Sequence, residues 1–232
     1  MSVTFQITLA ACLCLLATAG SVADKPAKSA HETRSIEGFT VEIDKSLLPK
    51  GDALGAAAVR LLEVKLYDIS RVVPAAALAK LRTVAIRLDR DDPATTCACY
   101  HPSKLWLVEH GFDATLERHV HLANATKFLE WSKDQPSMVL HELAHAYHDQ
   151  VLGYTDARVL DTFAKAVASK HYESVLHSNG STEKHYALSN EQEYFAETTE
   201  AWFGTNDMYP FVRPELAQFD PDAAKLMSAV WK

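Results

Sequence analysis

The segment 138–148, which reads MVLHELAHAYH, constrains this chain more than any other part of its sequence. Pro136 precedes it, at a position typical of a helix start. On an α-helix His141 and His145 lie one turn apart and about 40° apart around the axis, so both imidazoles can reach one ion. Glu142 is the only Asp, Glu, Lys or Arg in the segment. A helix this apolar is expected to be buried, and a buried helix holds two histidines and a glutamate only if these polar groups have partners. The pattern predicts a buried helix with a zinc site and Glu142 as a general base; the alternative is a chance HExxH match.

A catalytic zinc site needs a third protein ligand. His148 lies seven residues after His141, about 10.5 Å along a helix axis. Because the three histidines cannot converge over that length, we expect His148 to be a polar neighbour and not a ligand. His119 and His121 share one face of a predicted strand and could chelate a metal, but we expect them to be solvated.

Acidic residues at helical spacing occur in the segment 189–203. The capping-box spacing of Ser189 and Gln192 predicts the start of a helix there. Three glutamates fall within about 60° of one another on that helix, namely Glu193, Glu197 and Glu200. No Lys or Arg between residues 189 and 207 compensates their charge. The residues leave two interpretations open: an amphipathic helix that exposes acids to solvent, or a helix that supplies a zinc ligand.

The stretch 186–197, YALSNEQEYFAE, resembles the ligand helix of the lethal-factor-like metallopeptidases, the family of the catalytic domain of anthrax lethal factor. An HExxH motif followed downstream by an acidic ligand helix is also the gluzincin arrangement. The resemblance implies that Glu193 is the third zinc ligand and that Glu197, one turn on, supports a ligand histidine. It also implies that Tyr186 faces the metal-bound substrate oxygen. The resemblance extends over residues 141–203 and does not carry over the toxin's substrate.

The N-terminal residues predict an exported protein. Residues 7–19 form an apolar run that is shorter than the roughly 20 residues needed to span a bilayer, so we expect no stable membrane insertion. A small-residue cleavage site follows, which predicts a signal peptide over 1–23 and a secreted or periplasmic chain. The polar stretch 24–36 predicts a flexible leader, and the remaining residues, 37–232, a single zinc metallopeptidase domain.

Strand patterns come early in the chain and helical patterns late, which predicts an α+β domain of the zincin-like type. We expect a small twisted sheet with the active-site helix against it and a helical C-terminal half. The predicted strands are 39–43, 83–88, 105–108 and 118–122; the predicted helices are 52–70, the stretch after Pro136, and a last helix capped by Asp220. Residues 118–123 are expected to form the sheet edge that pairs with an extended peptide.

Two cysteines remain after the signal peptide, Cys97 and Cys99. They cannot make a disulfide scaffold, so the hydrophobic core must supply the stability. We expect a local staple or two thiols; a metal or redox role is the alternative.

A net charge of 23 − 30 = −7, without a basic stripe, disfavours nucleic acid as a partner. The chain is therefore expected to be an exported zinc metallopeptidase acting on a peptide or protein. Zinc held by His141, His145 and Glu193 would activate a water, Glu142 would take its proton, and Tyr186 would stabilise the oxyanion. Two alternatives stay open: a zinc amidohydrolase for a non-peptide amide, and a catalytically silent secreted protein that binds zinc or a partner.

Overall fold

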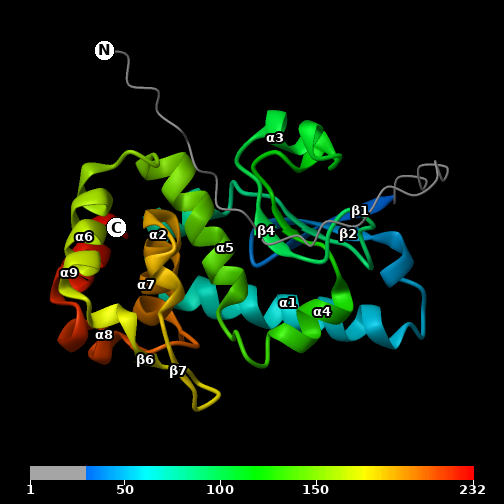
Figure 1. The fold of residues 1–232 in the computed structure, drawn as a ribbon. Coiled ribbons are helices and arrows are strands. Elements are labelled where there is room, and N and C mark those ends of the chain that lie inside the picture. The colour runs from blue at the N-terminus through cyan, green and yellow to red at the C-terminus, as the bar shows by residue number, and fades with distance from the viewer. Residues whose placement is uncertain (1–29) are drawn as a thin grey trace.

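Five strands form one mixed sheet in the computed structural model, which describes residues 30–232 (Figure 1). The spatial order is β1-β2-β3-β5-β4, so β1 and β4 are the two edges. Strands β2, β3 and β5 are parallel, whereas β1 and β4 pair antiparallel with their neighbours. The strands are β1 (His31–Ile36), β2 (Phe39–Asp44), β3 (Ile86–Leu88), β4 (Ala98–Tyr100) and β5 (Val120–Leu122), with a separate pair β6 (Val175–Leu176) and β7 (Thr182–Glu183).

Helices make up most of the second half of the chain and lie beside and below the sheet in Figure 1. They are α1 (Ala53–Val72), α2 (Ala75–Leu81), α3 (Lys104–Glu109), α4 (Ala125–Trp131), α5 (Met138–Tyr147), α6 (Ala157–Ser169), α7 (Glu191–Phe203), α8 (Arg213–Phe219) and α9 (Pro221–Val230). Short turns of other helical types are η1 (Lys45–Leu47), η2 (Ala114–Leu116), η3 (His148–Leu152), η4 (His171–Glu173) and η5 (Tyr186–Leu188). This is the α+β layout predicted from the sequence.

Helix α1 shows how local sequence builds the core. Asp52 caps it by accepting a hydrogen bond from the Gly55 N–H at 2.7 Å. A Cβ atom on Gly55 would lie 1.7 Å from the Leu47 carbonyl oxygen, so only glycine lets α1 pack against η1. Apolar side chains three or four positions apart, such as Leu62 and Leu66, are fully buried in the main hydrophobic cluster.

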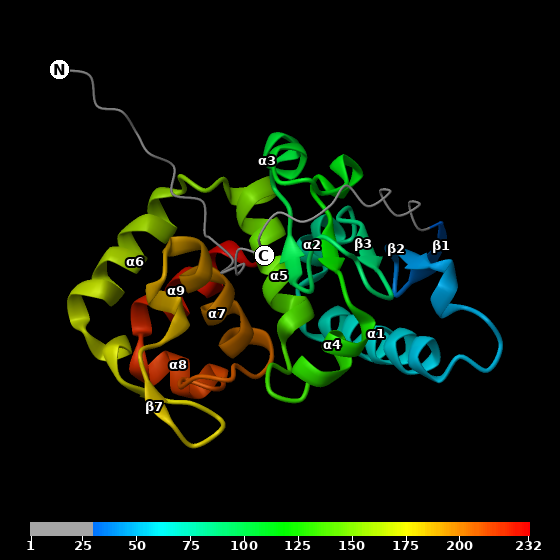
Figure 2. The ribbon, with the colours of Figure 1, turned by 45° about the vertical axis from the view of Figure 1, so that its right-hand side comes forward.

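Helix α5 lies between the sheet and the helical half of the molecule. It contacts β4 and β5 on one side and α7 on the other, and both Figure 1 and Figure 2 show it between the sheet and α7. Its apolar residues Leu143, Ala144 and Ala146 are buried, which accounts for the apolar composition of the segment. The HExxH segment therefore joins the two halves of the fold.

Several local predictions are wrong, each for a physical reason. Residues 31–36 of the predicted leader form β1, joined to β2 by a turn with positive φ at Glu37 and Gly38. Because β1 is a largely exposed edge strand, it lacks the apolar alternation that predicts a strand. Residues 24–29 of the predicted leader and the predicted signal peptide lie outside the described residues. The predicted strand 105–108 is part of α3, because Ser103 caps a helix there through the Trp106 N–H.

The predicted sheet edge is also wrong. Strand β5, within 118–123, lies between β3 and β4, and the actual edge near α5 is β4.

Cys97 and Cys99 form a disulfide at the start of β4. The predicted N-cap Asp220 of α9 is confirmed, since its side chain accepts from the Ala223 N–H. Within residues 30–232 no helix combines the length and apolar character needed to cross a membrane.

Candidate metal centre

Helices α5 and α7 bring three predicted ligands together. His141 and His145, one turn apart on α5, face Glu193 in the first turn of α7. The two Nε2 atoms lie 3.0 Å apart, and Glu193 Oε2 lies 3.1 Å from His141 Nε2 and 3.3 Å from His145 Nε2. Three ligand atoms from two helices thus form a nearly equilateral triangle, which we call the metal centre.

The size of this triangle suits zinc. In a tetrahedral zinc site with Zn–N and Zn–O distances of roughly 2.0–2.1 Å, neighbouring ligand atoms lie about 3.3 Å apart. The three distances above are close to that value. Burial raises the pKa of Glu193, but hydrogen bonds from His141 and His145 outweigh burial and lower that pKa below its usual range. Glu193 is therefore an anion flanked by two imidazoles, the donor set of a catalytic site with three protein ligands.

The capping of α7 fixes where Glu193 lies. Asn190 Oδ1 accepts hydrogen bonds from the N–H groups of Gln192 and Glu193, at 2.9 and 2.8 Å. The predicted cap at Ser189 is therefore wrong by one residue, because the Asn190 side chain reaches both free N–H groups. The shift does not change the face on which Glu193 lies.

Glu142 lies between the metal centre and the sheet edge. Its Oε2 atom accepts a hydrogen bond from the Tyr100 N–H of β4 at 2.7 Å. Burial raises the pKa of Glu142, and the charge of Glu193 adds to this increase. The Tyr100 hydroxyl donates to Asp149 Oδ2 at 2.6 Å, which ties β4 to the turn after α5. A buried carboxylate with a raised pKa beside two ligands is suited to accept a proton near neutral pH.

The glutamate nearest to the Nδ1 atom of His141 is Glu200 and not Glu197. The His141 Nδ1–H group donates to Glu200 Oε1 at 2.7 Å, whereas Glu197 Oε1 lies 3.6 Å from the same nitrogen. Glu197 instead accepts a hydrogen bond from Asn206 Nδ2 at 2.9 Å. Glu200 is therefore the acid that hydrogen-bonds His141, and the supporting role of Glu197 stays a prediction.

The two acids also differ in their electrostatics. Burial raises the pKa of Glu197 well above its usual value, and the nearby charge of Glu200 raises it further. Burial also raises the pKa of Glu200, but the hydrogen bond from His141 works against that increase. The hydrogen bond to His141 thus distinguishes Glu200 from Glu197.

Two tyrosines lie near the ends of the helices that form the centre. Tyr186, in η5 just before α7, has a side chain that is 52% exposed, and its predicted role stays a prediction. Tyr154 was not predicted. Burial raises its pKa far above the usual value, and the negative charges of Asp149, Glu142 and Glu193 add to this increase. Only the helix break at Gly153 marks this position in the sequence.

His148 is not part of the metal centre, as predicted. It begins η3 and is completely buried, with its ring against those of Tyr154 and Phe195. Neither ring nitrogen has a hydrogen-bond partner among the described residues. Burial lowers the pKa of His148 to about 4, so the ring is neutral at neutral pH.

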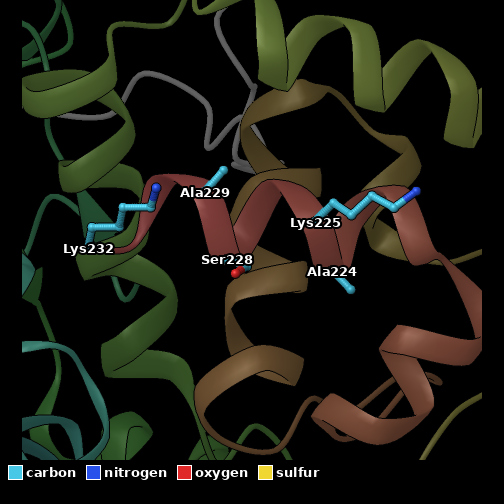
Figure 3. A pocket seen from close by; sticks show the side chains of 5 residues that line it. All are labelled: Ala224, Lys225, Ser228, Ala229 and Lys232. Atoms are coloured by element: carbon cyan, nitrogen blue, oxygen red, sulfur yellow. The ribbon is translucent and has the colours of Figure 1, made fainter.

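A hollow along α9 is lined by Ala224, Lys225, Ser228, Ala229 and Lys232. Figure 3 shows these side chains spread along the helix, without polar groups that converge on one point. None of the predicted site residues lines it, so it plays no part in the site.

Comparisons with known proteins add little to this geometry. No family model matches the sequence, and no curated protein matches it. Among solved structures the chain is similar to the PRO-PRO endopeptidase PPEP-2 from Paenibacillus alvei, with 18% identity and a TM-score of 0.47 over 84% of this chain and 99% of that one. The functional conclusion below depends on the side chains described above.

Proposed function

We propose that this chain is an exported zinc metallopeptidase of the gluzincin type, with the lethal-factor-like ligand helix that residues 186–197 suggest. The observation that carries the proposal is the triangle of His141, His145 and Glu193 with Glu142 beside it. Export is supported by the signal-like residues 1–23, and a disulfide suits an oxidising compartment.

In the proposed reaction each residue has a distinct task. Bound zinc would supply a Lewis acid that polarises a peptide carbonyl and lowers the pKa of water. Glu142 accepts the proton on the side of Oε1, because Oε2 is held by the Tyr100 N–H. Glu200 holds the His141 ring so that its Nε2 atom points toward the ion. Tyr186 donates a hydrogen bond to the negative charge that develops on the substrate oxygen.

An extended peptide would bind along β4. On the side that faces β5, the backbone of β4 is already paired. The Cys97 carbonyl accepts a hydrogen bond from the Ala123 N–H, and the His101 N–H donates to the His119 carbonyl. Backbone groups alternate along a strand, so those of Ala98 point to the outer edge, the side on which the Tyr100 N–H reaches Glu142. A substrate strand added at this edge would place its backbone beside the general base.

The test is a cleavage screen with a library of peptides derived from a proteome, using residues 24–232 with and without a chelator. We expect cleavage that disappears with the chelator and in Glu142→Gln, and returns when zinc is added to the wild type. Cleavage of non-peptide amides alone would replace the peptidase with an amidohydrolase. Zinc binding without any turnover would make the chain a silent binding protein.

A further inference from the structure

A second group of metal-ligating side chains lies at the end of the sheet, away from the metal centre. Asp89 and Asp92 follow β3, and His121 is in the adjacent parallel strand β5. One ligand atom from each of the three lies within 4.8 Å of the other two. We call these three residues the sheet-end cluster.

The backbone holds the cluster in place. The Asp89 N–H donates to the Leu122 carbonyl at 2.9 Å, and the Asp92 N–H donates to the Ala123 carbonyl at 2.8 Å. Both aspartates are therefore fixed against the end of the strand that carries His121. The expectation that His121 is solvated is wrong: the residue is completely buried, because β4 and its connection to β5 cover it.

The distances resemble those around a tetrahedral ion. His121 Nε2 lies 2.8 Å from Asp89 Oδ2 and 3.7 Å from Asp92 Oδ2, which are values on either side of the roughly 3.3 Å expected between zinc ligands. His31 Nε2 hydrogen-bonds the other carboxylate oxygen of Asp89 at 2.6 Å and so holds that ligand from outside the cluster. Two carboxylates and one imidazole are a ligand set that zinc accepts, with water in the fourth position.

Two further features point to a cation. Among residues 30–232 neither aspartate forms an ion pair with a lysine or arginine, so their charge is balanced only by imidazoles. The other nitrogen of His121, Nδ1, lies 3.4 Å from His101 Nε2, which can accept its proton. Metal-ligating histidines usually donate the second N–H in this way, which leaves Nε2 directed at the ion.

We propose that the sheet-end cluster binds a second divalent transition-metal ion, such as zinc, with a structural role. Asp89, Asp92 and His121 are its ligands, and His31 orients Asp89. The ion would join the loop after β3 to β5, and so would hold the segment that leads into β4. The Asp92 side chain is 19% exposed and gives the ion a path from solvent.

The test separates the two sites by mutation. The double variant His141→Ala/His145→Ala removes the metal centre, and its zinc content after dialysis is measured by mass spectrometry. We expect about one zinc ion per chain to remain, and a rise in melting temperature when zinc is added. Adding Asp92→Asn should abolish both, because the amide is a poor zinc ligand of the same shape. The matched control His119→Ala, which faces Glu42 near the same strand, should keep both.

Loss of all zinc from the double variant, with a melting temperature that does not respond to zinc, would overturn the proposal. Retention of zinc after Asp92→Asn would overturn it too, because the ion would then lie elsewhere. Circular dichroism of each variant verifies the fold, and the conservative Asp92→Asn change preserves the Ala94 N–H contact of Asp92 Oδ1. Failure here leaves the peptidase proposal intact, since that depends on the other site.

Discussion

The metal centre and the sheet-end cluster contain similar residues but differ in how far their histidines are exposed. The side chains of His141 and His145 are each 13% exposed, whereas that of His121 is fully buried. Glu142, the proposed general base, lies beside the first site, whereas the imidazoles of His31 and His101 lie beside the second. The comparison teaches that ligands alone do not define catalysis: access for substrate and a base next to the ion do so.

The largest expected effect is the loss of a ligand at the metal centre. Glu193→Ala removes one corner of the triangle, so zinc at this centre and peptidase activity should be lost together. Glu191→Ala, at a partly exposed position in the same helical turn, is the matched control and should keep both. Metal analysis beside a cleavage assay measures the outcome; an active Glu193→Ala would remove Glu193 from the ligand set.

The base can be tested without disturbing the ligands. Glu142→Gln keeps the shape of the side chain and both imidazoles, so zinc content should not change. Activity should fall by roughly 10²–10⁴-fold, because the amide cannot take a proton. The same pair of assays applies, and full cleavage activity in this variant would show that Glu142 is not the general base.

Tyr186 and Tyr154 are the two candidates for stabilising the negative charge on the substrate oxygen. Tyr186→Phe should lower kcat by about 10²-fold or more with little change in KM if its hydroxyl stabilises the oxyanion. Tyr154→Phe should then have a smaller effect. Steady-state kinetics of both variants decides between them, and the reverse order would assign the oxyanion to Tyr154.

The orienting acid should have a moderate effect. Glu200→Gln weakens the hydrogen bond to His141, so zinc affinity or activity should fall by roughly 10–100-fold. Glu197→Gln should cost less, because Glu197 does not hydrogen-bond His141. Zinc titration of both variants tests this order; equal losses would show that the two acids act as one unit.

The smallest effect concerns stability and pH. Burial lowers the pKa of His148 to about 4 and that of His185 to about 3. The unfolded chain binds these protons near pH 6.5, so stability should fall as the pH drops from 6.5 toward 4. His148→Leu should reduce that slope, whereas His110→Leu, at an exposed position, serves as the control. Denaturant unfolding at several pH values measures it; an unchanged slope in His148→Leu would contradict the buried neutral ring.

The sequence predicted the parts of the fold that depend on local periodicity. Helices α1 and α5 follow from apolar residues at helical spacing, and the ligands on α5 follow from their four-residue separation. The choice between Glu197 and Glu200 could not be made in this way, because both lie on the same face of α7. Which one contacts His141 depends on how α5 and α7 pack.

Contacts between segments far apart in the sequence could not be predicted either, because they depend on how the elements pack and not on local periodicity. The sheet-end cluster depends on the register of β3 against β5, which joins Asp89 to His121 across the sheet. Strand β4 lies in a stretch rich in Asp, Pro, Thr and Cys that has no strand pattern. Its position as the edge beside Glu142 is a property of the topology and not of its residues.

The most direct test of the central claim is anomalous X-ray scattering at the zinc absorption edge, from crystals of the zinc-loaded protein. The account predicts a peak about 2.0–2.1 Å from His141 Nε2, His145 Nε2 and a Glu193 oxygen. A zinc-loaded crystal without a peak at those three residues would contradict it.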